Sequence, residues 1–254
     1  MKICKQKKKK KLKKKVIIKA LLLIFLIFNN YKMTFEVLEN TDPEIIRIFI
    51  VRHGQTDHNV QKILQGHLDT DLNETGRNQA QTVGKFFSQI PIDYFLSSDL
   101  IRCQQTLQPI MAHQEKDNVK YTANLRERDM GKVQGMYLKD ALETYGPGFR
   151  NLGEKEAELC ARVGKEWLDL VDQDYSNVIF CTHGGVITRF TKYLHETLGY
   201  KLNNKLTPAD LKVPFNTSIT VVDVSKKSKE GIIQDFGNTL HLGGQFEVKE
   251  QMLR

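Results

Sequence analysis

Two histidines in this sequence follow short apolar runs and precede glycines. The run 45–52 leads to His53, and the run 177–182 leads to His183. Each run has the length and β-branched composition of a strand that is buried on both faces of a parallel sheet. Ligands of open α/β sheets bind just beyond the carboxyl ends of the strands. Both imidazoles are therefore predicted to lie at a ligand site, where the glycines allow close backbone approach.

Two arginines add fixed positive charge to this prediction. Arg52 directly precedes the first histidine, and Arg102 lies in the first turn of a helix predicted over 100–114. A positive charge in the first turn opposes the helix dipole, and a bound anion would remove the conflict. The guanidinium fork matches phosphoryl oxygens bidentately. Together with the two imidazoles, these side chains predict a cationic pocket for a phosphoryl group.

The sequence also indicates how the phosphoryl group would be handled. It contains no glycine-rich Walker loop and no carboxylate cluster suited to Mg²⁺, so we expect neither a metal nor a cofactor. A neutral histidine nitrogen can attack phosphorus directly and form a covalent phosphohistidine. The leaving alkoxide then needs a proton, and Glu127, in the charged segment 126–129, is the candidate donor.

Five segments carry a resemblance to a known family. They are Val-Arg-His-Gly-Gln-Thr-x-x-Asn at 51–59, Leu-Asn-Glu-Thr-Gly at 72–76, Ser-Ser-Asp-Leu-x-Arg-Cys at 97–103, Leu-Arg-Glu at 125–127 and Thr-His-Gly-Gly at 182–185. In this order they resemble the motifs of the histidine phosphatase superfamily, also called the phosphoglycerate mutase-like family. The resemblance spans about residues 45–245 and is greatest to small fungal broad-specificity phosphatases.

The resemblance implies a role for each matching residue. His53 would be the nucleophile and Glu127 the proton donor, and Arg52, Arg102 and His183 would complete the catalytic set. The residues expected to bind substrate are Arg52, Gln55, Thr56, Asn59, Gln65, Gly66, Arg102 and Gly184. The pocket walls are expected from residues 60–70 and 128–152, including Gln65, Tyr137, Tyr145 and Arg150.

The expected function is a phosphatase that hydrolyses small phosphomonoesters through a phosphohistidine on His53. One alternative is a cofactor-dependent phosphoglycerate mutase-type phosphotransferase. Such mutases carry Arg-His-Tyr-Gly and then a long insertion after the acid, whereas this chain has Arg-Asp-Met-Gly at 128–131 and no such insertion. A second alternative is a non-catalytic scaffold that binds phosphorylated ligands. Neither the physiological substrate nor the oligomeric state follows from the sequence.

The elements needed to position these residues predict an α/β fold. We expect a three-layer sandwich with a mostly parallel central sheet and helices on both faces. Further strands are expected at 92–96, 119–125, 218–224 and 231–236, with the last two forming a closing hairpin. Helices are expected at 74–89, 100–114, 136–144, 154–172 and 186–198. Asn73 and residues 97–99 are expected to cap the first two helices, and 60–72 to form a loop.

The basic charge of the chain is concentrated at its N-terminus. The 254 residues carry a formal net charge of +8, but residues 1–32 contain 12 lysines and no acidic residue. Removing those lysines leaves 26 basic residues against 30 acidic ones. The remainder is mildly acidic and has no nucleic-acid signature, so we expect a small phosphorylated substrate as partner and no nucleic acid.

The first 32 residues form a basic and apolar extension. Lysine-rich residues 2–15 precede the apolar segment 16–28, which is shorter than the roughly 20 residues that a spanning helix needs. Three alternatives stay open: a membrane anchor, a disordered basic tail, or leader sequence before a true start at Met33. We expect one domain over 33–254, with membrane contact only if the extension is native.

Cysteine usage indicates the compartment. The four cysteines, Cys4, Cys103, Cys160 and Cys181, include no Cys-x-x-Cys pair and no zinc-site spacing. Reduced thiols favour a cytoplasmic protein, with the nucleus as an additional compartment and membrane anchoring as the lesser alternative.

Overall fold

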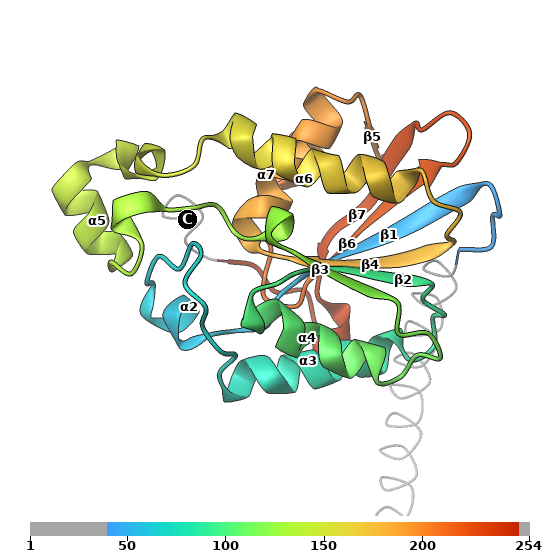
Figure 1. Ribbon diagram of the computed structural model, residues 1–254, viewed down its shortest axis with the longest axis horizontal. Coiled ribbons are helices and arrows are strands. Elements are labelled where there is room, and N and C mark those ends of the chain that lie inside the picture. The colour runs from blue at the N-terminus through green and yellow to red at the C-terminus, as the bar shows by residue number, and fades with distance from the viewer. Residues whose placement is uncertain (1–39, 249–254) are drawn as a thin grey trace, which may run out of the picture. The chain divides into compact units, whose positions relative to one another are not determined.

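Two neighbouring strands of one sheet position the two histidines. In the computed structural model, which describes residues 40–248, β1 (Ile45–Arg52) and β4 (Asn177–Thr182) pair in parallel. Their side chains are largely buried because helices cover both faces of the sheet (Figure 1). The predicted strand ends are confirmed, and His53 and His183 therefore leave the sheet at the same edge.

The sheet places these two strands near its centre. In the described residues its order is β3-β2-β4-β1-β6-β7-β5. The other strands are β2 (Tyr94–Ser98), β3 (Val119–Thr122), β5 (Lys201–Leu202), β6 (Ile219–Ser225) and β7 (Gly231–Asn238). Pairing is parallel except where β6 runs antiparallel to both β1 and β7. The mostly parallel sheet and the closing hairpin, β6–β7, are both confirmed.

The helices form the two outer layers. Their bounds are α2 (Asp57–Gln61), α3 (Glu74–Phe87), α4 (Ile101–Met111), α5 (Leu138–Tyr145), α6 (Glu156–Val171) and α7 (Gly184–Glu196). Figure 1 shows α3 and α4 on one face of the sheet and α6 and α7 on the other. The predicted three-layer α/β sandwich is confirmed. Helices α2 and α5 lie beyond the ends of the strands that carry the histidines (Figure 1).

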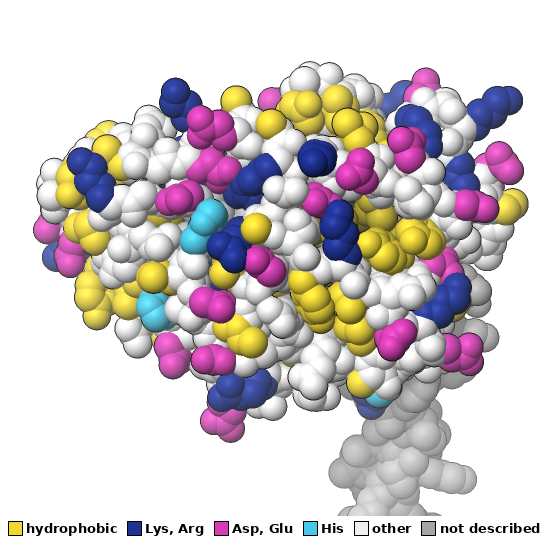
Figure 2. Space-filling model, in the orientation of Figure 1, with side chains coloured by type: hydrophobic (Ala, Val, Ile, Leu, Met, Phe, Trp, Pro, Cys, Tyr) yellow, Lys and Arg dark blue, Asp and Glu magenta, His cyan; other side chains and the backbone are white. Residues whose placement is uncertain are grey.

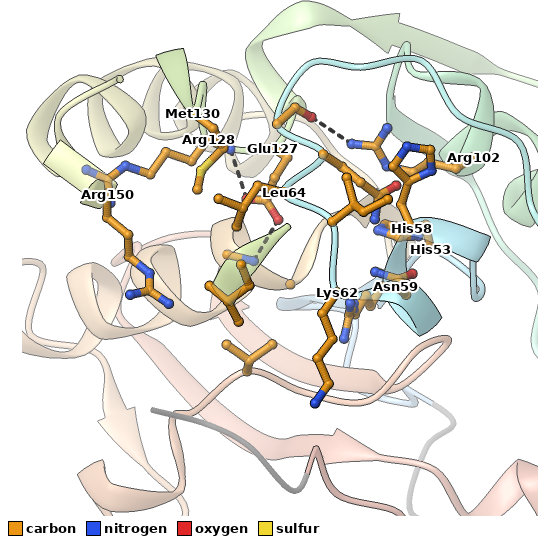
Figure 3. A pocket seen from close by; sticks show the side chains of 18 of the residues that line it. His53, His58, Asn59, Lys62, Leu64, Arg102, Glu127, Arg128, Met130 and Arg150 are labelled. Carbon is orange, nitrogen blue, oxygen red and sulfur yellow. Dashed lines mark hydrogen bonds between the residues drawn. The ribbon is translucent and has the colours of Figure 1, made fainter. Parts of the chain in front are cut away.

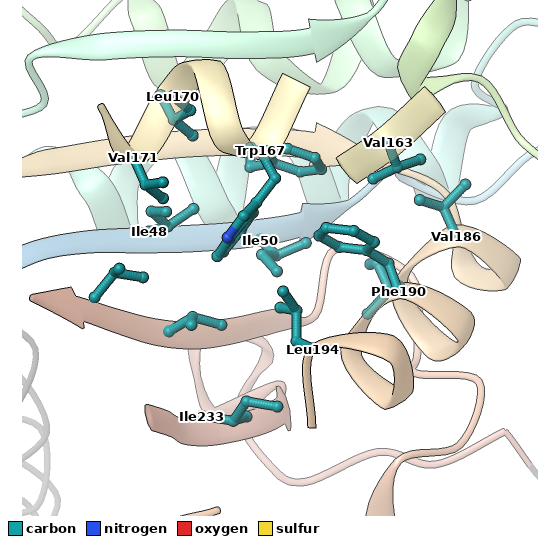
Figure 4. Packing of buried hydrophobic residues seen from close by; sticks show 14 of the residues in the cluster. Ile48, Ile50, Val163, Trp167, Leu170, Val171, Val186, Phe190, Leu194 and Ile233 are labelled. Carbon is teal, nitrogen blue, oxygen red and sulfur yellow. The ribbon is translucent and has the colours of Figure 1, made fainter. Parts of the chain in front are cut away.

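A tryptophan joins the upper helical layer to the sheet. Trp167 of α6 is fully buried, with its ring centroid 5.9 Å from that of Phe180 on β4 and 5.5 Å from that of Phe190 on α7 (Figure 4). Its indole nitrogen donates to the Tyr200 hydroxyl at 3.1 Å, so its one polar group is satisfied. This packing holds α7, which begins directly after His183, against the strand that carries that histidine.

Some predicted boundaries are wrong for local reasons. Residues 97–99 do not cap α4, because Ser97 and Ser98 continue β2 by pairing with its neighbours, and the N-cap of α4 is Leu100, without a side-chain cap. The strand predicted at 119–125 ends at Thr122, where a 3₁₀ turn begins. The loop expected at 60–72 starts late because α2 occupies its first residues.

The predictions for the N-terminal extension lie outside the described residues, as does its boundary with the domain at Met33. From Asp42 onward the described residues belong to one compact unit. Within residues 40–248, no helix combines the length and apolar character required to cross a bilayer. Figure 2 shows basic and acidic side chains interspersed over one face of this unit. The expected absence of a nucleic-acid partner stays a prediction.

Candidate active site

The two histidine rings lie side by side at the sheet edge. Their centroids are 5.1 Å apart, and both side chains are buried. His53 Nδ1 lies 2.7 Å from the carbonyl oxygen of Gly54, which can only accept, so Nδ1 is the protonated nitrogen. Burial, followed by the charges of Arg102 and Arg52, holds the pKa of His53 well below 6.5. The neutral ring therefore carries a lone pair on Nε2, the atom that a nucleophile needs.

His183 is held by groups from the neighbouring strand and helix. Arg102 Nε donates to His183 Nδ1 at 3.2 Å, so the proton of the neutral ring resides on Nε2, 2.9 Å from Ser98 Oγ. Burial is the largest cause that lowers the pKa of His183 well below 6.5, followed by Arg102, His53 and Arg52. The end of β2 thus contributes Ser98 to the site, a residue that the sequence analysis assigned to a helix cap.

Arg102 connects α4 to the loop that closes the pocket. The side chain is fully buried, and its Nη1 and Nη2 donate to the carbonyl oxygens of Leu68 and Gly66 at 2.6 and 2.9 Å. Burial is the main cause that lowers its pKa. Arg102 therefore both brings positive charge to the pocket and fixes the conformation of the loop at Gly66.

Arg52 occupies the other side of the histidine pair. It is buried at the end of β1, and its Nη1 donates to the Pro214 carbonyl oxygen at 2.6 Å. The backbone of Gly184 lies directly against this guanidinium, since a Cβ there would be 3.1 Å from Arg52 Cζ. A larger residue after His183 would therefore press on the arginine, which would have to shift by a few tenths of an ångström.

The turn after His53 is built by a reciprocal helix cap. The Thr56 hydroxyl accepts from the Asn59 amide, and the Asn59 side chain accepts from the Thr56 amide, both at 3.1 Å. Thr56 Oγ1 also donates to Gln65 at 3.1 Å, and the Gln55 side chain accepts from Asn73. Gln55 and Thr56 thus bond within the protein and do not line the pocket, whereas Asn59 and Gln65 do.

Glu127 enters the pocket opposite the histidines, and two backbone amides orient it. Its Oε2 accepts from the Gly185 amide at 2.9 Å and its Oε1 from the Arg128 amide at 2.8 Å (Figure 3). Gly185 lies in the first turn of α7, directly after the His183–Gly184 pair. The N-terminus of one helix therefore aligns both a histidine and the carboxyl group.

These side chains line one pocket of about 140 Å³. The sequence-predicted residues that it brings together are Arg52, His53, Asn59, Gln65, Gly66, Arg102, Glu127, Arg150 and Gly184. His183 is not among the lining residues, but it contacts two of them, Arg102 and His53. Tyr137 and Tyr145, expected in the walls, are not among its lining residues. In the described part of the chain, no group of three or more His, Cys, Asp or Glu side chains could hold a metal ion.

Comparison with known proteins agrees with this geometry. Residues 48–231 match the family model of the histidine phosphatase superfamily (branch 1). The chain is 42% identical over 229 residues to a broad-specificity phosphatase of Saccharomyces cerevisiae, covering 85% of this chain and 96% of that protein. The chain belongs to the histidine phosphatase superfamily. The family resemblance inferred from the motifs is confirmed.

Solved structures show the same fold as this histidine phosphatase. A mycobacterial glucosyl-3-phosphoglycerate phosphatase superposes with a TM-score of 0.64 and 25% identity, covering 77% of this chain and 100% of that one. A phosphoglycerate mutase from Bacillus anthracis gives a TM-score of 0.67 at 20% identity, covering 80% and 97%. The second likeness is one of fold alone, so the choice between hydrolysis and transfer depends on the site.

The histidine phosphatase pocket also contains four basic residues that were not named from the sequence, although two of them lie within the expected wall segments 60–70 and 128–152. These are His58, Lys62, Arg128 and Arg189. No motif marks them, because they come from α2, from the segments after α2 and after Glu127, and from the second turn of α7. Arg189 also had a local signal, since it follows His183 by six residues on a helix that starts at the site. Only the folded structure brings these four side chains to the same pocket.

Proposed function

We propose that this chain hydrolyses small phosphomonoesters through a covalent phosphohistidine on His53, with Glu127 as general acid. The observation that carries the proposal is the geometry of His53. Its Nδ1 is fixed on the Gly54 carbonyl, and Nε2 of the neutral ring therefore bears the lone pair beside two buried arginines. Family membership and the similarity to named phosphatases support the same activity.

The first half-reaction transfers the phosphoryl group to the enzyme. Nε2 of His53 attacks phosphorus, and the bond between phosphorus and the ester oxygen breaks. A proton from the carboxylic acid of Glu127 passes to that oxygen, so the leaving group departs as a neutral alcohol. The two amides that orient the Glu127 carboxyl, at 2.8 and 2.9 Å, determine where this proton is delivered.

The second half-reaction restores the enzyme. Water attacks the phosphorus of the phosphohistidine while the Glu127 carboxylate accepts a proton from it, and the bond between phosphorus and Nε2 breaks. Inorganic phosphate leaves, His53 is neutral again, and Glu127 is protonated again. One carboxyl group thus acts first as an acid and then as a base.

Fixed cations supply the electrostatic part of this proposal. Negative charge spreads over the equatorial oxygens of a transferring phosphoryl group, and preorganised donors stabilise it most in a water-poor site. Arg52 and Arg102 are buried and already oriented by carbonyl groups before substrate binds. We therefore propose that the reaction needs no metal ion.

A panel of phosphomonoesters assayed with EDTA present tests the proposal. We expect release of inorganic phosphate from several small esters, at rates that EDTA does not change. A pocket of about 140 Å³ is below the roughly 300–1,000 Å³ of sites for drug-sized ligands, which favours compact esters. Activity that appears only with added Mg²⁺ would refute the metal-free mechanism.

The mutase alternative requires the phosphoryl group to return to a sugar-acid hydroxyl rather than to water. Residues 128–131 read Arg-Asp-Met-Gly, so the mutase-type sequence after the acid is absent from this chain. Incubation with 3-phosphoglycerate and its bisphosphate cofactor distinguishes the two. We expect free phosphate, whereas accumulation of 2-phosphoglycerate would establish a mutase.

The scaffold alternative predicts that the nucleophile is dispensable. A His53→Ala variant of a binding protein would keep its function, whereas the same variant of an enzyme should lose turnover by several decades.

For the cellular compartment, we propose the cytoplasm, with the nucleus as an additional location. The support is that Cys103, Cys160 and Cys181 are all buried free thiols in the described residues, as is usual in reducing compartments.

A further inference from the structure

Three arginines gather at the outer end of the pocket, away from the reacting atoms. Arg128, Arg150 and Arg189 come from different segments, and all three line the same cavity as His53. In Figure 3 the Arg128 and Arg150 labels lie on the opposite side of the pocket from those of His53 and Asn59. The proposed chemistry uses none of the three guanidinium groups.

The three guanidinium groups repel one another. The pKa of Arg150 is lowered by burial first and then by the charges of Arg189 and Arg128. Burial likewise lowers the pKa of Arg128, with Arg189 as the next cause. The largely exposed carboxylate of Glu156 lies 3.5 Å from Arg189 Nε, whereas Glu154 is paired with Arg162 at 2.6 Å. Positive charge at this end of the pocket is therefore only partly compensated.

Arg150 has donor capacity that the protein does not use. Its Nη2 is buried and has no hydrogen-bond partner in the described structure, and its guanidinium stacks only on Phe149, 4.4 Å from the ring centroid. Arg189 Nε is also buried and makes no hydrogen bond in the described residues, but it has an ion-pair partner, since the Glu156 carboxylate lies 3.5 Å away. Buried donors without partners cost free energy unless a ligand satisfies them. A guanidinium fork is best satisfied by the oxygens of phosphate or carboxylate.

Apolar side chains also line the pocket, among them Leu64, Met130 and Leu138. Figure 3 shows Leu64 between the arginines and His53. Apolar lining together with a cationic group at each end matches a compact carbon skeleton with an anionic group at each end. Arg128 differs from the other two arginines because its Nε donates to the Glu154 carbonyl oxygen at 2.7 Å, which fixes its position.

We infer that the preferred substrates carry a second anionic group, phosphate or carboxylate, which Arg150 and Arg189 bind while His53 attacks the first phosphate. This inference rests on the proposed phosphatase activity and deepens it. Such a substrate would be held at both ends, so the outer contact would contribute to binding the ground state and the transition state alike.

Matched esters of one chain length test this inference. We would compare butyl phosphate, butane-1,4-diol bisphosphate and 4-(phosphonooxy)butanoate, with propane and pentane homologues to vary the span. The expected kcat/KM is about tenfold to a hundredfold higher for the doubly anionic esters, the range for one or two charge-assisted hydrogen bonds. A gain with the bisphosphate alone would assign the site to phosphate, and a gain with both would assign it to either anion.

Variants of the outer arginines locate the effect. Arg150→Met and Arg189→Met should each bring the preference for the doubly anionic ester toward unity, whereas Arg150→Lys should retain part of it. Lys139→Met, which removes an exposed charge from α5, is the control for long-range electrostatics and should keep the full preference. Equal kcat/KM for single and double anions, or a preference that both methionine variants retain, would overturn the inference.

A binding measurement separates this inference from the catalytic proposal. If the wild-type chain released phosphate from none of the esters, the phosphatase proposal would fail. Calorimetric titration of the His53→Ala protein with the bisphosphate and with butyl phosphate would then still decide the outer site. Tighter binding of the bisphosphate that Arg150→Met abolishes supports it, and equal affinities contradict it.

Discussion

At the scale of single residues, the site depends on where each proton lies. The Gly54 carbonyl and Arg102 fix opposite tautomers on the two histidines: Nδ1 is protonated in His53 and Nε2 in His183. Motif matching identified both residues but could not assign these tautomers, because the deciding partners come from separate elements. Ser98 was assigned to the wrong role for the same reason.

Glu127 yields a prediction about leaving groups. With Glu127→Gln, the kcat for an alkyl phosphate should fall by about 10²–10⁴, since an alkoxide leaves poorly without a proton. The fall should be much smaller for p-nitrophenyl phosphate, whose leaving group is stable as an anion. Glu143→Gln, on the exposed side of α5, is the matched control. Equal losses on both substrates would mean that Glu127 is not the proton donor.

His241 yields a prediction about acid stability. Burial lowers its pKa to about 4, whereas the unfolded chain takes up this proton near pH 6.5. Between these values the unfolded state holds more protons, so stability falls as the pH falls. Replacing His241 with Phe removes this contribution, and the ring can still pack on Phe86. Between pH 7 and pH 4 the wild type should lose about 3 kcal/mol more than the variant.

Urea unfolding at each pH measures this difference. His53 and His183 also have lowered pKa values, but they are present in both proteins, so their contributions cancel in the comparison. Parallel loss of stability in both proteins would show that His241 does not titrate between the folded and unfolded states in this range.

At the scale of elements, α7 is the part that couples the histidine to the acid. Its first residues supply Gly184, which packs on Arg52, and Gly185, whose amide holds Glu127.

The sequence predicted this helix two residues late, because the glycines at its start were interpreted as a turn. The strand ends were predictable from their apolar runs. The extent of β2 was not, because strand pairing with β3 and β4 decides it.

Gly185→Ala tests this coupling. A Cβ at this position would collide with Glu127 Oε1, so the carboxyl group must move. We expect kcat to fall at least about tenfold, because proton transfer requires the donor in hydrogen-bond reach. The free energy of unfolding should fall by less than about 1 kcal/mol, since alanine has the higher helix propensity.

The matched control is Gly164→Ala in α6. There the nearest atom to a new Cβ is on the Phe190 ring at 3.9 Å, an ordinary contact, so activity should stay unchanged while stability rises slightly. Kinetics and thermal unfolding of both variants check the comparison. Full activity in the Gly185 variant would show that the position of Glu127 is not critical.

At the scale of the whole domain, the strand order assembles the site. Because β2, β4 and β1 are adjacent and parallel, their carboxyl ends bring Ser98, His183 and His53 to one edge. The convergence of the two histidines was predictable from the sequence, since parallel strands end at the same side of a sheet, whereas the place of Ser98 was not. Arg150 was expected in the pocket wall, but its meeting with Arg128 and Arg189 was not predictable, because it depends on how the segment around α5 folds over the pocket.

Detection of the phosphorylated enzyme tests the central claim most directly. The protein is mixed with an excess of substrate in the presence of EDTA, quenched within milliseconds at alkaline pH, digested and analysed by mass spectrometry. We predict one phosphoryl group on the peptide that contains His53, formed before steady-state phosphate release and absent from the His53→Ala protein. Phosphate on another residue, or full turnover by the His53→Ala protein, would contradict the account.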